Sequence, residues 1–436
     1  MAEELILEYA VDQPSIPTTN VETEVKVRLR VNAGEALRAM GEGAAIGANL
    51  CLVLDVSSSM RDREIKALTD AAKLVVNEVR PIDRLSIIAF QSTVYELVES
   101  ATVATDEDRR AIHKKLDTLS DLRGGGTDLE WALAKAEMAL NRDPDPAKSR
   151  KLIVFTDGQV TGVPARCLAE ASRIAGTRTS IDCLGFGAEF DYGFCQELVR
   201  PANGYTDQIT RTEGIAETFR KRIGQVQAAV ATNVELVLSF TPQVRAGRLY
   251  RHAPELAYLG PIALPGDSRD LVVPIGNVER DREYAYLVTA TVPQRPEGNI
   301  RVIKATLRYD VPALQCVGGE SLQSVVVFYT DDTQKSAVIN GEVLRAFDEA
   351  EIGRLVGELG NAASAGDHKR AAMFFDVLAR RYEELGNQEM KEHYHSLKGK
   401  YAQTGNLSLE DMNYSRHKST QKKETGVQLV DASDLI

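Results

Sequence analysis

The chain has 436 residues and a formal net charge of −11, with 43% hydrophobic and 26% charged residues. This composition is typical of globular proteins and excludes a wholly disordered chain, and the length predicts two to four domains. The negative charge argues against nucleic acid or an anionic membrane surface as the main partner, because both attract basic proteins.

The beginning of the chain, MAEELILEYA, lacks the basic and long apolar regions of a secretory signal. The longest apolar runs are far shorter than the roughly 20 residues that span a membrane. The cysteines lie scattered at Cys51, Cys167, Cys183, Cys195 and Cys316, without CxxC spacing. They are expected to be buried free thiols of a reducing compartment, so we expect a cytoplasmic protein without a membrane span.

Strand patterns occur at both sides of a central region. Residues 1–47 contain LILEYAV and VETEVKVRLRV, in which apolar and polar residues alternate as in half-buried strands. Residues 228–333 contain further short strand patterns separated by Gly and Pro, which is typical of a β-sandwich. Because two isolated strands are only marginally stable, we expect the N-terminal strands to join the later ones. The intervening domain is then inserted into a β-sandwich.

Residues 48–227 alternate between strand-like and helix-like segments. The apolar run NLCLVLDV is typical of a parallel strand that is covered on both faces. Helical patterns of ten or more residues separate it from DRLSIIAF, RKLIVFTDG and TSIDCLGFG, which read as further strands. This alternation predicts a doubly wound, Rossmann-like α/β domain.

Three polar clusters lie at strand ends or in loops of this domain: DVSSSM, RGGGTDL and FTDGQ. Ligands of doubly wound sheets bind beyond the carboxyl ends of the strands. The side chains expected to converge there are Asp55, Ser57, Ser59, Thr127 and Asp157. They offer only hard oxygen atoms, a set that suits Mg²⁺.

The pattern D-x-S-x-S, a later Thr in a Gly-rich loop and T-D-G at a strand end resembles the metal-ion-dependent adhesion site of von Willebrand factor A (VWA) domains. The resemblance implies that the three hydroxyls bind the ion directly or through water, and that the two aspartates are direct or water-bridged ligands that hold them. It implies Mg²⁺, with Mn²⁺ or Ca²⁺ as alternatives, and an open coordination position for an Asp or Glu of a partner protein. The layout resembles that of bacterial multidomain VWA proteins related to calcium-activated-chloride-channel regulators and to inter-alpha-trypsin inhibitor heavy chains.

Other interpretations of the cluster are weaker. Serine and aspartate also cap helix N-termini, but capping does not explain the whole set. A phosphatase of the haloacid-dehalogenase type requires D-x-D, and Ser57 stands at the second acid. The loop RGGGTD lacks the G-K-[ST] ending that binds phosphates. We therefore favour a non-enzymatic, Mg²⁺-dependent interaction scaffold whose partner is an AAA-type ATPase or a signalling protein. A Mg²⁺-dependent phosphohydrolase and a self-assembling structural subunit remain the alternatives.

Residues 334–403 show helical periodicity and are expected to form a small helical bundle, with one tetratricopeptide-like hairpin as the alternative. His393 and His395 are expected on its solvated surface. Residues 404–436 lose periodicity and are expected to be a flexible tail. Its end, VQLVDASDLI, is a candidate docking segment for a second partner, and Thr420 and Thr425 are candidate phosphorylation sites.

Overall fold

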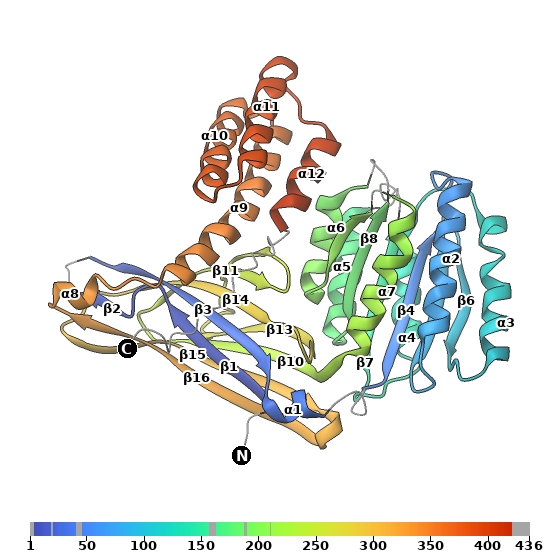
Figure 1. Cartoon of the computed structure of the whole chain (residues 1–436), viewed down its shortest axis with the longest axis horizontal. Helices are drawn as coiled ribbons and strands as arrows, with labels where there is room; N and C mark the ends of the chain where they lie inside the picture. Colours follow the sequence, from blue (N-terminus) through green and yellow to red (C-terminus); the bar gives the residue numbers. More distant parts are fainter. Residues whose placement is uncertain are drawn as a thin grey trace.

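Figure 1 shows the computed structural model of the chain. It describes residues 4–18, 21–40, 46–156, 163–186, 190–209 and 211–420. Three parts are visible: two large, mainly antiparallel sheets, an α/β layer structure, and a group of helices that lies above the sheets and beside the α/β part (Figure 1).

The first part consists of two five-stranded sheets. The strand order of one sheet is β1 (Leu5–Val11), β3 (Thr23–Ala33), β14 (Tyr284–Val292), β11 (Arg245–Ala253) and β12 (Ala257–Pro261). The order of the other is β13 (Asp270–Glu279), β10 (Ala229–Phe240), β15 (Gly298–Val311), β16 (Cys316–Thr330) and β2 (Ser15–Pro17). The short helix α1 (Glu35–Ala39) follows β3, and a 3-10 turn (Pro312–Leu314) joins β15 to β16.

The two sheets bury their apolar faces in one shared core. Along β3, Val25, Val27, Leu29 and Val31 alternate with more exposed polar residues, and each of the four is at most 1% exposed. β3 pairs with β14 in antiparallel register, so the N-terminal strands join the later strands as the alternating pattern predicts.

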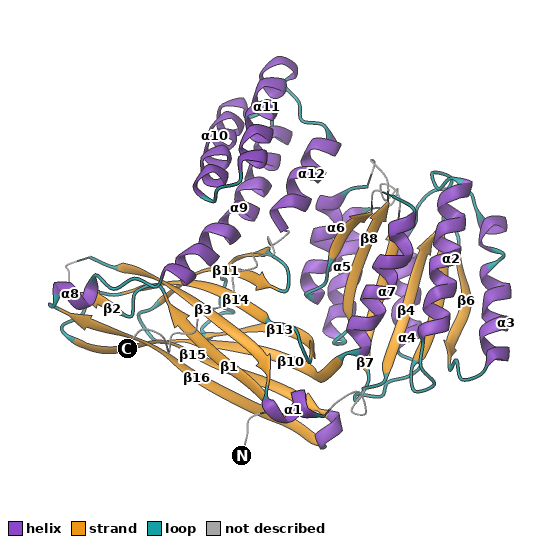
Figure 2. Ribbon diagram, viewed as in Figure 1, coloured by secondary structure: helices purple, strands orange, loops and turns teal. Residues whose placement is uncertain are grey.

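The α/β part occurs in the sequence between β3 and β10 and forms a six-stranded sheet (Figure 2). Its strand order is β6 (Val94–Ala101), β5 (Arg84–Phe90), β4 (Ala48–Asp55), β7 (Ser149–Thr156), β8 (Ser180–Phe186) and β9 (Thr206–Ile209). All pairings are parallel except that of β5 with β6. Every residue of β4 is buried, because helices cover both faces of the sheet.

One face of this sheet is covered by α2 (Asp62–Glu78), α3 (Asp106–Leu116) and α7 (Glu213–Gln227). The other is covered by α4 (Leu129–Leu140), α5 (Pro164–Gly176) and α6 (Tyr192–Val199). Two 3-10 turns, Leu119–Leu122 and Arg200–Ala202, complete this part. Leu50, Leu52 and Leu54 of β4 enter the first core, whereas Cys51 and Val53 enter the second. The predicted doubly wound α/β arrangement is confirmed.

The last part is helical and follows β16. It contains α8 (Thr333–Ser336), α9 (Gly341–Ser364), α10 (His368–Glu384), α11 (Gln388–Thr404) and α12 (Leu409–Thr420). Helices α9 to α12 share one apolar core. Within the described ranges, no helix combines the length and the apolar character that crossing a membrane requires.

The expectation of a flexible tail from residue 404 is wrong for residues 409–420, which form α12. This helix packs against α6 and α9. Met412 joins the apolar core, and Asn413, only 1% exposed, donates a hydrogen bond to the backbone oxygen of Phe190 at 2.5 Å. Apolar periodicity does not reveal α12, because many of its buried side chains are polar. Residues 421–436, with Thr425 and the candidate docking segment, lie outside the described residues.

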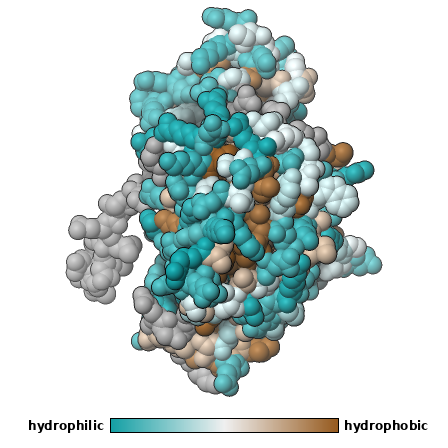
Figure 3. All heavy atoms as spheres, turned by 90° about the vertical axis from the view of Figure 1, so that its right-hand side faces the viewer, coloured by the Kyte–Doolittle hydropathy of each residue, from teal (hydrophilic) through white to brown (hydrophobic). Residues whose placement is uncertain are grey.

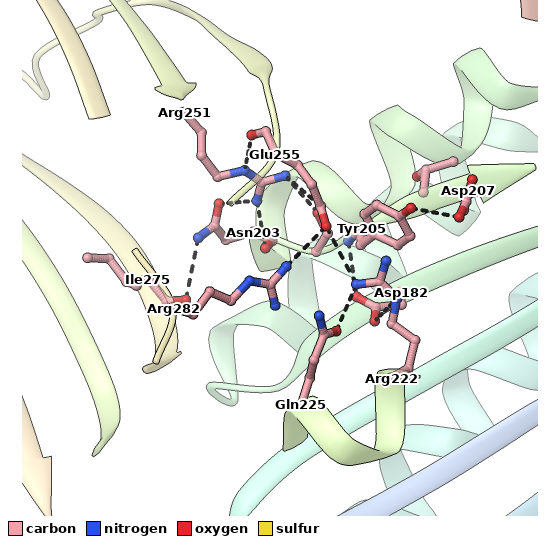
Figure 4. A network of polar contacts seen from close by, with 12 residues as sticks. Asp182, Asn203, Tyr205, Asp207, Arg222, Gln225, Arg251, Glu255, Ile275 and Arg282 are labelled. Atoms are coloured by element: carbon pink, nitrogen blue, oxygen red, sulfur yellow. Dashed lines mark hydrogen bonds and ion pairs between the residues drawn. The ribbon is translucent and has the colours of Figure 1, made fainter. Parts of the chain in front are cut away.

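A buried group of charged side chains joins the α/β part to the two sheets (Figure 4). Its centre is Glu255, in the turn between β11 and β12. The Glu255 carboxylate lies 3.2 Å from Arg282, 3.5 Å from Arg222 of α7 and 3.9 Å from Arg251 of β11. The guanidinium of Arg222 also stacks on the ring of Tyr205, 3.2 Å from its centre. One acid thus holds cations from both parts of the molecule.

Arg251 fixes the loop that precedes β9. Its guanidinium donates hydrogen bonds to the backbone oxygens of Asn203, at 2.7 Å, and Gly204, at 2.9 Å. Asn203 adopts a left-handed backbone conformation, with φ of 49°. Its amide nitrogen donates to the hydroxyl of Tyr286 in β14 at 2.9 Å. The loop is therefore bound to the antiparallel sheet from two directions.

Asp182 at the start of β8 extends this network into the α/β sheet. One of its oxygens lies 2.6 Å from the ammonium of Lys151, and the other lies 4.0 Å from Arg222. The Asp182 side chain is only 1% exposed. Burial lowers the pKa of Lys151, and the adjacent Asp182 opposes that shift.

We predict that Asp182→Asn destabilises the protein, because it leaves the buried Lys151 without a counter-charge. Breaking a buried ion pair on one side costs about 3–5 kcal/mol of unfolding free energy. The matched control is Asp117→Asn, which removes the partner of Lys73 in a surface pair and should cost less than about 1 kcal/mol. Urea denaturation followed by circular dichroism measures both, and equal effects of the two variants would contradict the prediction.

We also predict that the packing of α12 weakens in acid. His393 of α11 is half-buried, not on the solvated surface as expected, and its Nε2 lies 3.0 Å from the hydroxyl of Ser415 in α12. Burial lowers the pKa of His393 below 6.5, and the charged groups that also act on it are Asp411, Lys400 and Glu389. The folded state favours the neutral ring. The contribution of His393 to folding stability is therefore complete above pH 6.5 and is lost as the pH falls through the lowered pKa of the folded state.

Hydrogen exchange of residues 409–420, corrected for intrinsic rates and measured near neutral pH and at about pH 5.5, tests this. Exchange should accelerate more at the lower pH in the native chain than in His393→Gln. The exposed His395 provides the control, and His395→Gln should behave like the native chain. An identical pH response of His393→Gln and the native chain would show that this ring does not control the helix.

Candidate metal site at the carboxyl edge of the α/β sheet

Asp55 is the last residue of β4 and is fully buried. Its two oxygens accept hydrogen bonds from different elements: Oδ1 from the backbone nitrogen of Ser57 at 2.8 Å, and Oδ2 from the hydroxyl of Thr156 at 2.6 Å. Burial raises the pKa of Asp55, although these hydrogen bonds oppose the shift. The carboxylate is therefore fixed in place where β4 and β7 end side by side.

The serines that follow Asp55 turn the chain away from the sheet. Ser57 is 1% exposed, whereas Ser59 is exposed. Their hydroxyl oxygens are 2.9 Å apart. Ser58, between them, points elsewhere and donates a hydrogen bond from its hydroxyl to the backbone oxygen of Gly125 at 2.9 Å. The three serines thus divide into a pair beside Asp55 and one that binds the neighbouring loop.

The glycine-rich loop before α4 lies against this turn. The backbone nitrogen of Gly124 donates to the oxygen of Val56 at 3.1 Å, and that of Ser58 donates to Gly125 at 3.3 Å. Gly125 has φ of 62°, and a Cβ atom there would lie 2.2 Å from the side-chain oxygen of Gln91. A larger residue at position 125 would collide with Gln91 in the loop after β5, and the left-handed backbone there also favours glycine. Thr127, 4% exposed, ends the loop.

The structure brings some of the predicted site residues together, but it does not describe all of them. Hydrogen bonds bring Asp55, Ser57 and Ser59 together, and the loop that carries Thr127 is bound to the same turn. Asp157 follows Thr156 directly but lies outside the described residues. The sequence reasoning missed Thr156 itself, although it is the first residue of the T-D-G motif.

The geometry of the described residues fits a small divalent cation. Two adjacent ligands of an octahedral Mg²⁺ ion, each at about 2.1 Å, lie roughly 3 Å apart. The hydroxyls of Ser57 and Ser59 are hydrogen-bonded at 2.9 Å, a separation that would also suit two adjacent ligands of such an ion. Among the described residues, no three His, Cys, Asp or Glu side chains are grouped as metal ligands. A cation here would accordingly depend on hydroxyl oxygens as well as on Asp55.

The order of strands places this group at a topological switch point. Helix α2 follows β4 and leads to β5 on one side of it, whereas β7 lies on the other side. Loops that leave neighbouring strands in opposite directions open a crevice at the carboxyl edge of such a sheet. Asp55 ends β4, one of the two strands that border this crevice, so its carboxylate lies where a ligand would bind.

Comparison with known proteins agrees with this geometry. Residues 50–159 match the family described as von Willebrand factor type A domain. The uncharacterized protein sll0103 of Synechocystis sp. is 26% identical over 276 residues, which cover 61% of this chain and 62% of that protein. The inter-alpha-trypsin inhibitor heavy chain H1 of Mesocricetus auratus is 25% identical over 229 residues, which cover 49% of this chain and 25% of the relative. The chain thus spans less than two thirds of each of these relatives.

Solved structures resemble the whole chain. A von Willebrand factor type A protein from Catenulispora acidiphila superposes with a TM-score of 0.79 at 19% identity, covering 97% of this chain and 98% of that one. The ArnB paralog VWA2 from Sulfolobus acidocaldarius gives a TM-score of 0.60 at 16% identity, covering 96% and 98%. At these identities the likeness concerns the fold alone. Together with the family match over residues 50–159, it identifies a von Willebrand factor type A domain in this chain.

Proposed function

We propose that the chain is a protein-interaction scaffold whose VWA domain binds a divalent cation and, through it, an acidic side chain of a partner. Domains of this family commonly mediate protein–protein interaction, and the inhibitor heavy chains among the relatives are consistent with such a role. The proposed ligands are Asp55, Ser57, Ser59, Thr127 and Asp157, and the proposed ion is Mg²⁺, with Mn²⁺ or Ca²⁺ as alternatives. The observation that carries the proposal is the pair of serine hydroxyls beside the buried Asp55.

The chain's own residues prepare the site by holding ligands in position. Thr156 and the backbone of Ser57 fix both oxygens of Asp55, so that the carboxylate loses little freedom when an ion binds. Ser58 ties the serine turn to the glycine-rich loop and so holds Thr127 near the same edge. This preorganisation lowers the entropic cost of ordering the ligands.

The coordination of the proposed ion favours an acidic partner. The bound ion would supply a positive centre with a coordination position left for an oxygen ligand. Asp55 and Asp157 together balance the charge of a dication, so a partner carboxylate would be attracted by the open coordination position and not by excess positive charge. Arg123 lies beside the serine turn: its guanidinium donates to the backbone oxygen of Ser58 at 3.3 Å, and its charge is balanced by Asp62 at 2.5 Å.

A Mg²⁺-dependent phosphohydrolase is the alternative from another class of function. General acid–base catalysis requires a titratable group in reach of the reacting atoms. The hydrogen bonds that hold Asp55 come from Thr156 and Ser57, neither of which titrates in the physiological range. None of the relatives reported above carries an enzyme name. Turnover of a generic phosphate ester that disappears in Asp55→Asn would favour the enzyme.

The partner and the compartment are inferred from the charge and composition of the chain. The net charge of −11 favours a protein partner over nucleic acid. We propose an AAA-type ATPase or a signalling protein that presents an Asp or Glu, in the cytoplasm. The segment VQLVDASDLI is proposed to dock a second partner. Self-assembly through this segment or through the VWA domain is the structural alternative.

We further propose a division of the chain into functional units. The VWA domain, residues 48–227, is inserted into a β-sandwich built from residues 1–47 and 228–333. Residues 334–403 form a helical domain, and residues 404–436 follow it. The pairing of β3 with β14 and the shared core of the two sheets support this division. The packing of α12 against α9, and of Met412 in the core of the helices, supports assigning residues 409–420 to the helical domain and not to the tail.

We predict that Thr156→Val weakens Mg²⁺ binding roughly 10- to 100-fold, because it removes the hydroxyl that positions Asp55 without changing the shape of the side chain. Ser59→Ala should weaken it through loss of a ligand oxygen. The comparison is Ser58→Ala, which removes the tie to the glycine-rich loop but no proposed ligand, so it should weaken binding less than Ser59→Ala. Isothermal titration with Mg²⁺ and Mn²⁺ measures the affinities. Equal affinities in Ser59→Ala and Ser58→Ala would exclude Ser59 as a ligand.

A second prediction concerns partner capture. Thr127→Ala should leave the fold intact, since it removes one neutral donor from a loop, but should reduce recovery of bound proteins in a pull-down. EDTA should have the same effect on the native chain, and excess Mg²⁺ should reverse it. Mass spectrometry of the proteins recovered with and without EDTA measures both effects. If truncation at about residue 404 removes the partner while EDTA and Thr127→Ala do not, the tail makes the contact instead.

A further inference from the structure

A cavity lies where the three parts of the chain meet. The face of the molecule in Figure 3 is mainly hydrophilic, with hydrophobic groups scattered between. Apolar side chains are more concentrated around a cavity of about 840 Å³ between α6, the turn that joins β11 to β12, α9 and α12. They include Phe194 of α6, Leu256 of the turn and Met412 of α12. Small-molecule sites have this size and occur preferentially at boundaries between domains.

Helix α9 lines the cavity with a row of glycines. Gly353, Gly357 and Gly360 are spaced by four and three residues, so they lie on one face of the helix. Gly360 is packed, because a Cβ atom there would lie 3.0 Å from the side chain of Met412. At Gly353 and Gly357 a Cβ atom would meet nothing within 4 Å outside the backbone of α9 itself.

The packing of the chain itself therefore does not require glycine at positions 353 and 357. Glycine is the least favourable residue inside a helix after proline, so its presence there needs another reason. A group that lies directly on the helix backbone would provide one, because a side chain at either position would keep it away. The cavity supplies the space for such a group.

The side chain of Arg416 in α12 reaches into the cavity between α6 and α9. A Cβ atom at Gly193 of α6 would collide with its guanidinium, and one at Gly360 of α9 would lie 3.3 Å from it. The two glycines thus leave room for a half-buried cation at the junction of the helical part and the VWA domain.

The charge of Arg416 is poorly compensated. Within the described ranges it forms no ion pair, and the carboxylates that act on its pKa are those of Asp191 and Glu197. Glu197 pairs with Arg200 at 2.8 Å, and Asp191 accepts a hydrogen bond from the backbone nitrogen of Phe194 at 3.0 Å. Burial lowers the pKa of Arg416, which reflects the cost of its charge in this place. An anion in the cavity would supply a counter-charge.

We propose that the cavity is a binding site for a small organic anion. Its carboxylate or phosphate group pairs with Arg416, since a guanidinium binds either group through two parallel hydrogen bonds. Its planar body lies on the bare backbone at Gly353 and Gly357. The proposal is independent of the metal site, because none of the five proposed metal ligands lines this cavity. A ligand here would stabilise the packing of the three parts, since it contacts all of them.

The probe for the test is anilinonaphthalene sulfonate, a planar aromatic anion that binds apolar sites of proteins. Fluorescence titration of the full chain should show binding. Gly357→Leu, which fills the cavity, and Arg416→Gln, which removes the cation, should each weaken it roughly 10-fold or more. The matched controls are Gly399→Leu, at an exposed glycine of α11 with open space around it, and Arg345→Gln, at an exposed arginine of α9. Neither control should change the affinity.

Melting temperatures separate loss of the site from loss of the fold. Gly357→Leu should keep or raise the Tm, because leucine favours a helix more than glycine does. Arg416 also packs between two helices, so Gly357→Leu carries the decision, and Gly353→Leu replaces it if its Tm falls. Equal affinities of the folded cavity variant and Gly399→Leu would overturn the proposal.

Displacement of the probe identifies the anionic group. Benzoate and phenyl phosphate carry the two candidate groups on the same ring, whereas benzyl alcohol is neutral. At least one of the two anions should displace the probe, and the more effective one names the group. Displacement by neither anion, or equal displacement by benzyl alcohol, would contradict an anion site. EDTA should have no effect, and loss of probe binding in EDTA would place the probe at the metal edge and overturn the proposal.

Discussion

The position of the VWA domain depends on the buried charges around Glu255. This carboxylate lies in a turn of the antiparallel sheets and faces Arg222, which belongs to α7 of the VWA domain. Charges that are removed from water are stable only in the presence of counter-charges, so separation of the two parts would expose an unbalanced set. Two chain connections, before β4 and after α7, join the same parts covalently. The VWA domain is therefore held against the sheets by electrostatics and by connectivity together.

This arrangement leaves the carboxyl edge of the VWA sheet accessible. The charged network contacts the opposite side of the domain, at the starts of β7 and β8, where Lys151 and Asp182 lie. Asp55 and the serine turn are at the ends of the strands, on the far edge. Under the proposed function, the partner and the chain's own sheets therefore contact opposite edges of the domain. Helix α12, which packs on α6, brings the helical part close to that edge.

Much of the VWA domain follows from local patterns. Continuous apolar strands that alternate with amphipathic helices permit few arrangements other than a doubly wound sheet, because parallel strands need crossover helices on both faces. The carboxyl ends of neighbouring strands then meet, and this alone predicts that Asp55 and the serines lie at one site. The pairing of β3 with β14 was predictable for a similar reason, since an isolated hairpin cannot bury its apolar face.

Contacts between residues distant in the sequence were decided only by the tertiary structure. Thr156 belongs to the T-D-G motif, but its hydrogen bond to Asp55 was not predictable, because the bond joins residues about a hundred positions apart in the sequence. Helix α12 was missed because Asn413 and Ser415 bury polar side chains whose partners lie on other elements. The sequence by itself determined the class of each layer and the edge where polar side chains gather, since periodicity is a local property. The charged network and the place of α12 were decided by tertiary packing, because burial depends on which surfaces meet.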